Sequence, residues 1–272
     1  MQVLIISGGS IDTKYALAFL SKREYDYVIA VDKGALFCWE NGIRPDMVAG
    51  CSAGAIFGAI YAAGTDLYLL GRFAETLVAK DLVDPTFPQK GGLLNGEKVR
   101  ELVRILTHNL THAGTRIPFY CTAVDLQSGE QKVFDRGLLC DNVRASMAVP
   151  GVFTPARVEG RWYGDGGILE ELPVKCLRER GADIVLTSDL GIKKNEFDGD
   201  HLSAVDVLNR SFSIMQEHMT AAQTDKGDVV MRPDASFMGL LLTSNAAHSV
   251  EEGRKAAMEA LPRIRTLLQM EA

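Results

Sequence analysis

The fold is decided by the stretch Met47-Val48-Ala49-Gly50-Cys51-Ser52-Ala53-Gly54, which joins a short apolar strand to a helix rich in small residues. The strand is expected over residues 47–49 and the helix over residues 55–63. Ser52 is the centre of a G-x-S-x-G pentapeptide, in which Gly50 and Gly54 let the backbone turn sharply between strand and helix. The arrangement predicts a nucleophile elbow. The alternative is a turn that only packs the helix on the strand.

Outward from this turn, strands and helices alternate along the chain. Short apolar runs predict buried strands, and longer periodic segments predict helices. The alternation favours a three-layer α/β/α fold with a mostly parallel central sheet, formed by residues 1–272 as a single domain. The strands are expected at 3–6, 27–31, 47–49, 118–124, 131–135, 161–163 and 184–187, and the main helices at 96–109, 142–147, 203–220 and 250–270.

A nucleophilic serine needs a base, and the best candidate is Asp165 in the segment Tyr163-Gly164-Asp165-Gly166-Gly167. Glycines on both sides let the carboxylate approach another backbone closely, although an Asp-Gly hairpin turn is the alternative. None of the five histidines lies in a loop bounded by Gly or Pro, so each is interpreted as a surface or structurally satisfied residue. The strongest of them as an alternative base is His248; the others are His108, His112, His201 and His218.

The pairing of the Ser52 pentapeptide with Asp165-Gly166-Gly167 resembles the patatin-like phospholipases, which use a Ser-Asp dyad without histidine. The resemblance extends from about Pro45 to the C-terminus and includes four further segments, residues 91–96, 122–130, 143–153 and 172–174. It implies a patatin-like fold and a serine acyl hydrolase of the esterase or lysophospholipase type. The expected partners are a lipid or small ester substrate and, transiently, a membrane surface, with no metal and no cofactor.

The resemblance also assigns roles within the site. Ser52 would attack the ester and form an acyl-enzyme, with Asp165 as its base. The amide of Ala53, at the positive end of its helix, and the amides of Gly8 and Gly9 would form the oxyanion hole.

The first 50 residues depart from that family. Where its members carry a Gly-Gly-Gly-x-Arg/Lys-Gly loop, this chain has Ser7-Gly8-Gly9-Ser10-Ile11-Asp12, without the basic residue and the closing glycine. This segment, with residues 29–34 and 42–46, resembles the N-terminal part of thiamine pyrophosphokinase. We therefore hypothesise a chimera joined near residues 45–50, whose first part adds a Rossmann-like strand–helix unit to the same sheet.

Three rival functions follow. The altered loop allows a chimeric scaffold with little or no activity. A Ser-His-Asp hydrolase would use His248 as base, and a kinase-like transferase would derive from the N-terminal segment.

The composition of the chain restricts the classes of partner and the cellular location that are expected. A net charge of −6 without a basic cluster argues against nucleic acid. Five widely spaced cysteines indicate buried thiols in a reducing compartment, and the start of the chain lacks the features of a signal peptide, so a cytoplasmic location is expected. Several apolar residues near the C-terminus fit core packing better than an acyl pocket: Met215, Met219, Phe237, Met238 and 240–242.

Overall fold

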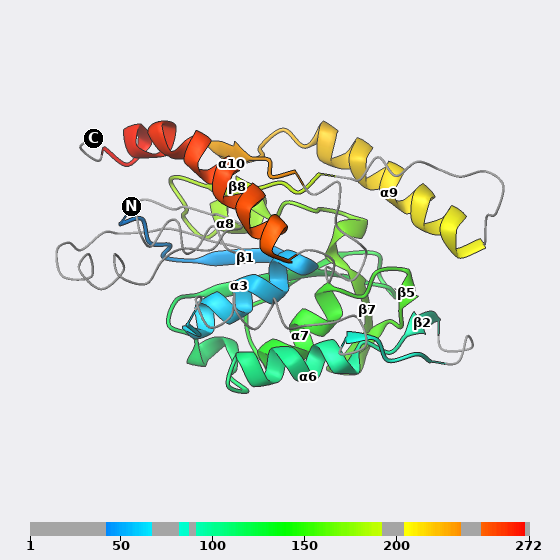
Figure 1. The fold of residues 1–272 in the computed structure, drawn as a ribbon. Helices are drawn as coiled ribbons and strands as arrows, with labels where there is room; N and C mark the ends of the chain where they lie inside the picture. The colour runs from blue at the N-terminus through cyan, green and yellow to red at the C-terminus, as the bar shows by residue number, and fades with distance from the viewer. Residues whose placement is uncertain (1–41, 67–81, 87–90, 192–203, 235–245, 270–272) are drawn as a thin grey trace.

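The computed structural model describes residues 42–66, 82–86, 91–191, 204–234 and 246–269 (Figure 1). Its helices are α3 (Ala53–Ala63), α6 (Glu97–Leu106), α7 (Leu139–Ser146), α8 (Val174–Arg178), α9 (Ala204–Ala222) and α10 (Ala246–Leu267), with the short 3-10 turns η2 (His112–Gly114) and η3 (Gly166–Ile168). Its strands are β1 (Val48–Cys51), β2 (Gly92–Leu94), β3 (Phe119–Asp125), β4 (Gln131–Phe134), β5 (Gly151–Phe153), β6 (Ala156–Val158), β7 (Arg161–Asp165), β8 (Leu186–Ser188) and β9 (Val229–Met231). The predicted extra strand at residues 27–31 lies outside the described residues.

The central sheet has five strands in the order β1-β3-β7-β6, with β4 also paired to β3. Sequence analysis predicts a mostly parallel sheet, but in the described part only the β1–β3 pairing of this sheet is parallel. Part of the reason is local: β4 follows β3, and β7 follows β6, through a short turn, and such turns produce antiparallel pairs. The sheet is therefore mixed, within the α/β fold that the sequence indicates.

The β3–β4 turn is fixed by Asp125, at the end of β3. Its Oδ1 accepts hydrogen bonds from the amides of Gln127 and Ser128, and Gly129 adopts a φ of 73°. Asp125 is also paired with Arg161 at the start of β7. These contacts link three strands at one end of the sheet.

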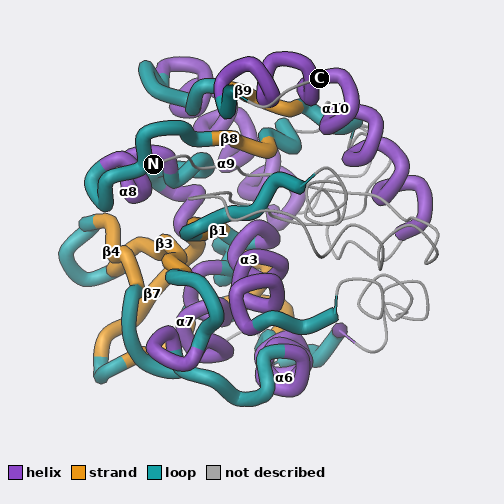
Figure 2. The backbone as a smooth tube through the Cα atoms, turned by 90° about the vertical axis from the view of Figure 1, so that its left-hand side faces the viewer, coloured by secondary structure: helices purple, strands orange, loops and turns teal. Residues whose placement is uncertain are grey.

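Helices cover both faces of the sheet. In Figures 1 and 2, α3, α6 and α7 lie on one side of β1 and β3, whereas α8, α10 and the β8–β9 pair lie on the other. All four residues of β1 are buried, and α3 packs against it through small residues. This packing holds the turn between β1 and α3 at the centre of the molecule. Among the helices that the structure describes, none is both long enough and apolar enough to cross a membrane.

Candidate active site

The turn between β1 and α3 places Ser52 in a strained backbone conformation. Ser52 is the residue between the last residue of β1 and the first of α3, with φ 53° and ψ −120°. Such a conformation is costly for a residue with a side chain and is found where a nucleophile is held on a strand-to-helix turn. A Cβ at Gly50 would overlap the Gly54 carbonyl and lie 2.6 Å from the Ala55 nitrogen. The turn is thus possible only with glycine at position 50.

The segment 143–153 supports this turn from α7. The fully buried Ser146 accepts a hydrogen bond from the Ser52 amide at 3.0 Å, and the Ala148 carbonyl accepts one from the Asp165 amide, also at 3.0 Å. Arg144 of the same segment donates to the carbonyl oxygens of Asn95 and Thr154. One segment therefore positions both Ser52 and Asp165, and ties them to the β2–β5 pair.

Asp165 ends β7 and lies beside the elbow, although 113 residues of sequence separate it from Ser52. β7 pairs with β3, which in turn pairs with β1. Asp165 is only 1% exposed. Its Oδ1 accepts a hydrogen bond from the Gly167 amide at 2.8 Å and one from the Cys51 thiol at 3.7 Å. The topology of the sheet thus brings together the two residues that the sequence selects.

Burial raises the pKa of Asp165 from 3.8 to about 6, and the Ser52 hydroxyl, the Gly167 amide and the Cys51 thiol partly oppose this rise. The Ser52 side chain is thus one of the groups that favour the charged form of Asp165. Nevertheless, Asp165 Oδ2 is buried and has no hydrogen-bond partner among the described residues. One carboxylate oxygen is therefore held in place, while the other is left available to a proton donor.

The Cys51 thiol is a further contact of this carboxylate. Burial, followed by the nearby charge of Asp165, raises the pKa of Cys51 well above its ordinary value, so the thiol stays protonated and donates a hydrogen bond to Asp165. Gly166 lies directly against this thiol. If residue 166 had a Cβ, that atom would lie 2.9 Å from Cys51 Sγ. A side chain at position 166 would push the Asp165 loop away from the elbow.

The amide of Ala53 lies at the N-terminus of α3, where the first amides of a helix have no partner within the helix. Partial positive charge at this end favours an anion beside Ser52. The other expected donors, Gly8 and Gly9, lie outside the described residues.

Comparison with known proteins identifies the family of the chain. Residues 4–177, well over half of the 272-residue chain, match the patatin-like phospholipase family. The chain belongs to the patatin-like phospholipase family.

Curated relatives of this family member are longer proteins. An uncharacterized NTE family protein of Mycobacterium tuberculosis is 36% identical over 154 residues, which cover 56% of this chain and 42% of the relative. Lysophospholipase NTE1 of Pyricularia oryzae is 25% identical over 256 residues, covering 83% of this chain and 17% of the relative. The chain therefore spans less than half the length of these relatives.

Among solved structures, the crystal structure of VipD from Legionella pneumophila matches with a TM-score of 0.48 and 14% identity, covering 96% of this chain and 66% of that one.

Among the described residues of this patatin-like chain, no histidine is hydrogen-bonded to Ser52 or Asp165. His112 is buried elsewhere, with Nδ1 2.8 Å from the Phe119 carbonyl oxygen and Nε2 3.0 Å from Asn142 Nδ2. Burial lowers its pKa, so it is a neutral, satisfied residue of the kind expected. His218 and His248 are exposed on α9 and α10, and His201 lies outside the described residues.

Three residues of the site were not selected from the sequence: Cys51, Ser146 and Gln216. Cys51 and Ser146 lie inside motifs that the resemblance includes, so their positions were visible although their contacts were not. Gln216, in the middle of α9, donates to the Gly167 carbonyl at 3.1 Å. No sequence pattern points to that contact, because it depends on how α9 docks.

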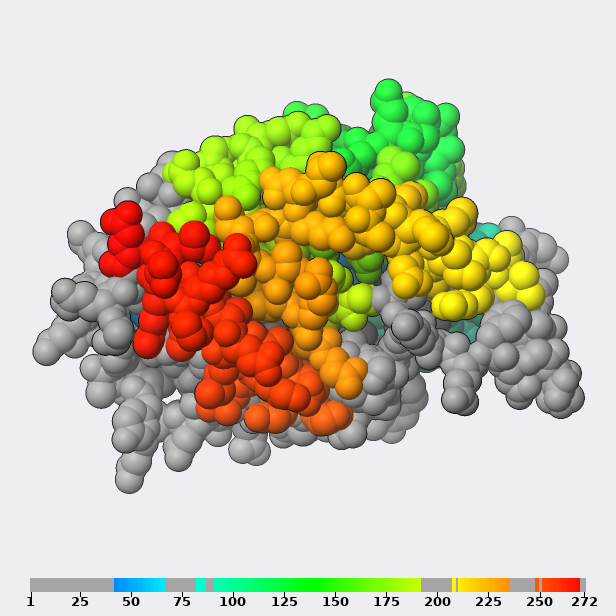
Figure 3. Space-filling view, turned by 90° about the horizontal axis from the view of Figure 1, so that it is seen from above, coloured from blue at the N-terminus to red at the C-terminus, as the bar shows by residue number. Residues whose placement is uncertain are grey.

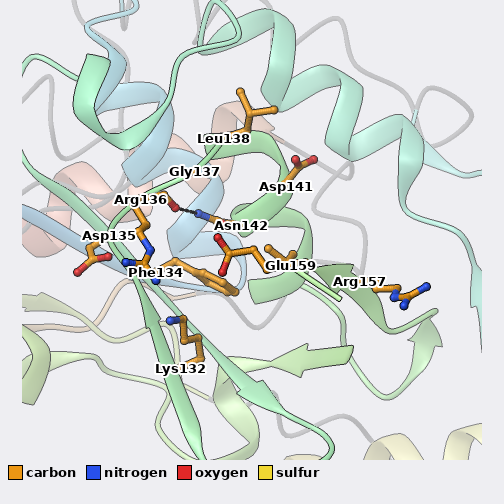
Figure 4. Close-up of a pocket in the computed structure, with 11 residues that line it drawn as sticks. Lys132, Phe134, Asp135, Arg136, Gly137, Leu138, Asp141, Asn142, Arg157 and Glu159 are labelled. Atoms are coloured by element: carbon orange, nitrogen blue, oxygen red, sulfur yellow. Dashed lines mark hydrogen bonds between the residues drawn. The ribbon is translucent and has the colours of Figure 1, made fainter. Parts of the chain in front are cut away.

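A cavity of about 190 Å³ lies away from this site, between β4, β6 and the start of α7 (Figure 4). Its wall mixes cations with anions, and the Asn142 amide there is already bonded to the Arg136 carbonyl. Neither Ser52 nor Asp165 lines it. The charged lining residues are Lys132, Arg136, Arg157, Asp135, Asp141 and Glu159.

Proposed function

We propose that this patatin-like protein is a serine acyl hydrolase of the esterase or lysophospholipase type, with Ser52 as nucleophile and Asp165 as its base. The observation that carries the proposal is the strained Ser52 turn beside a buried carboxylate, one oxygen of which is held while the other has no partner among the described residues. A base next to a nucleophilic hydroxyl, itself oriented by a third group, is the general arrangement for covalent catalysis by serine.

In the proposed reaction, Asp165 Oδ2 accepts the Ser52 hydroxyl proton as Oγ forms a bond to the ester carbonyl carbon. Collapse of the tetrahedral intermediate breaks the bond to the leaving alcohol, which takes the proton from Asp165. Water then gives a proton to Asp165 and attacks the acyl carbon. Ser52 leaves and recovers its proton, releasing the acid.

Stabilisation of the oxyanion is assigned to the amide of Ala53 together with Gly8 and Gly9. Loss of one such donor typically costs about 10²–10³-fold in rate. The departure of residues 7–12 from the family loop is therefore the reason why a scaffold with little activity is the second candidate.

A lipid or small ester is the proposed substrate class. The support is family membership and the similarity to the lysophospholipases NTE1 of Pyricularia oryzae and Saccharomyces cerevisiae. Both relatives are much longer than this chain, so the assignment of their substrate class to it is part of the proposal.

Labelling with a fluorophosphonate tests the function directly. The probe phosphonylates serines that are activated as nucleophiles, so we expect one adduct by intact mass, and peptide mapping should place it on the peptide containing Ser52. A heat-denatured sample should not react. A folded protein that acquires no adduct would support the inactive scaffold, and an adduct on another serine would contradict the assignment.

The labelling rate should depend on pH with a half-maximum near pH 6. Because the pKa of Asp165 is raised to about 6, the carboxylate is the base above that pH and is protonated below it. The rate should reach a plateau above about pH 7 and fall about tenfold per pH unit below about pH 5.5. Stopped-time labelling across pH 4.5–8 (about half a unit per step) measures the profile. A half-maximum near 4, the ordinary range of a carboxyl group, would show that the base is solvated or is a different residue.

The thiamine pyrophosphokinase-like character of residues 1–50, and a chimeric origin, stay hypotheses. The family match begins at residue 4 and so includes nearly all of this segment, while residues 1–41 lie outside the described residues. Saturable binding of thiamine or ATP, measured by calorimetry, would support the hypothesis, and no heat of binding would count against it.

A further inference from the structure

Helix α9 makes several of its contacts with the rest of the protein through polar side chains. Gln216 donates to the Gly167 carbonyl at 3.1 Å, and Thr220 donates to Glu171 Oε2 at 3.1 Å. Just past the end of the helix, the Gln223 amide donates to the Leu172 carbonyl at 2.9 Å. A surface helix of a globular protein usually does the reverse, with its apolar stripe facing the core.

Five apolar side chains of α9 are exposed, whereas Phe212 is half-buried. Val207, Leu208, Ile214, Met215 and Met219 are between 36% (Met219) and 61% (Leu208) exposed. Val207 and Ile214 are seven residues apart, as are Leu208 and Met215, and Met219 follows Met215 by four residues. These spacings place the five side chains along one side of the helix. We call these five residues the α9 stripe. The prediction that Met215 and Met219 pack in the core is therefore wrong, because the polar side of the helix makes the contacts with the protein.

The α9 stripe lies next to the Asp165 loop. Gln216, next to Met215 in the sequence, bonds to Gly167, two residues from Asp165, and α9 packs directly on η3. Leu169, which follows η3, is also exposed. Figure 3 shows α9, coloured yellow, on the outer surface of the molecule. The α9 stripe therefore lies on the helix that contacts the loop carrying the candidate base.

Size and charge indicate what this surface contacts. Five side chains at these exposures offer on the order of 500 Å² of apolar surface, less than the roughly 800 Å² per partner of a standard protein interface. A second copy of the chain would therefore be held weakly. The stripe itself carries no charged side chain, and the net charge of −6 disfavours an anionic membrane. A zwitterionic lipid surface needs neither shape complementarity nor basic residues, and an exposed apolar helix face can enter its interface.

We propose that the α9 stripe docks on a zwitterionic phospholipid surface and places the Ser52–Asp165 site at that surface. The choice of a lipid occupant rests on the proposed function. Docking brings the Asp165 loop to the water–lipid boundary, where the ester bond of a lipid lies, so a single-chain or two-chain lipid reaches Ser52 without crossing bulk water.

Flotation with phosphatidylcholine vesicles tests the proposal. The full chain is expected to float with the vesicles, and Leu208→Gln/Met215→Gln should lower the bound fraction at least about tenfold. The matched control is Ile105→Gln/Met258→Gln, which replaces residues of similar exposure (58% and 48%) on α6 and α10 and should float like the parent. Circular dichroism melting verifies that each variant is folded. A second pair, Val207→Gln/Ile214→Gln, should repeat the loss.

Two results would overturn the proposal: a folded parent that does not float, or a control pair that loses binding as much as the α9 pair does. A concentration-dependent dimer in light scattering, abolished by the α9 pair, would assign the stripe to a second copy and overturn it too. Ser52→Ala should still float. If the parent protein floats with the vesicles but is not labelled by the fluorophosphonate, the proposed function is contradicted. If the parent is labelled but does not float, only the docking surface is contradicted.

Discussion

Asp165→Asn is expected to lower kcat/KM for a soluble ester such as a p-nitrophenyl ester by about 10³-fold or more, while the protein stays folded. Asparagine keeps the shape of the side chain, and its Oδ1 can still accept the Gly167 amide bond. It cannot take a proton from Ser52. The loss should therefore appear in kcat as well as in kcat/KM, because the proton transfer occurs in the transition state.

The double variant Ser52→Ala/Asp165→Asn distinguishes a dyad from two separate contributions. Residues that act as one unit are strongly non-additive, so the double variant should be no slower than Ser52→Ala alone. Asp135→Asn, at an exposed carboxylate, is the matched control and should keep the parent rate. Retained activity in Asp165→Asn, together with loss in His248→Ala, would instead establish a histidine-dependent hydrolase.

The same substitution should leave stability unchanged or raise it. The pKa of Asp165 is raised from 3.8 to about 6, so the folded state holds a proton more tightly than the unfolded state does. Deprotonation of Asp165 therefore lowers the free energy of unfolding as the pH rises from 3.8 to about 6, and the full loss of stability is present at pH 7.5. A neutral asparagine removes the cost. A melting temperature at pH 7.5 equal to or above that of the parent is expected, as is typical where a site is built at the expense of stability.

The elbow and its aspartate were predictable because their chemistry is local. Glycines at positions 50 and 54 and the small residues of α3 are visible in the sequence, and the turn that they allow is present. The β3–β4 hairpin was also predictable, since Gln127, Ser128 and Gly129 are turn formers between two apolar runs. These features depend on a few adjacent residues.

Other features depend on contacts between distant segments. The bond from the Ser52 amide to Ser146 and the Cys51 contact to Asp165 arise from the order of strands in the sheet, which no short pattern encodes. The orientation of α9 was mispredicted for a related reason. Apolar periodicity shows that a helix has two faces, but burial of the apolar face is only the usual outcome, and here the half-buried Gln216 and Thr220 make contacts with the rest of the protein.

Gly50→Ala is expected to lower the free energy of unfolding by about 3 kcal/mol or more. The added Cβ would meet the backbone of Gly54 and Ala55 rather than the end of a flexible side chain. Backbone at the first turn of α3 can move only if the helix shifts along β1, where every residue is buried. Urea unfolding followed by circular dichroism measures the loss.

Gly114→Ala is the matched control, because its Cβ would lie 3.1 Å from Leu110 Cδ2, a side-chain end that can move. Its effect should stay within about 1 kcal/mol, since the smaller conformational freedom of alanine in the unfolded chain offsets a slight contact. Equal stabilities for the two variants would show that α3 adjusts easily and that the turn at Ser52 is not strained. If Gly50→Ala does fold, the displaced turn should also slow labelling of Ser52, because strand, turn and helix set the position of the hydroxyl relative to Asp165.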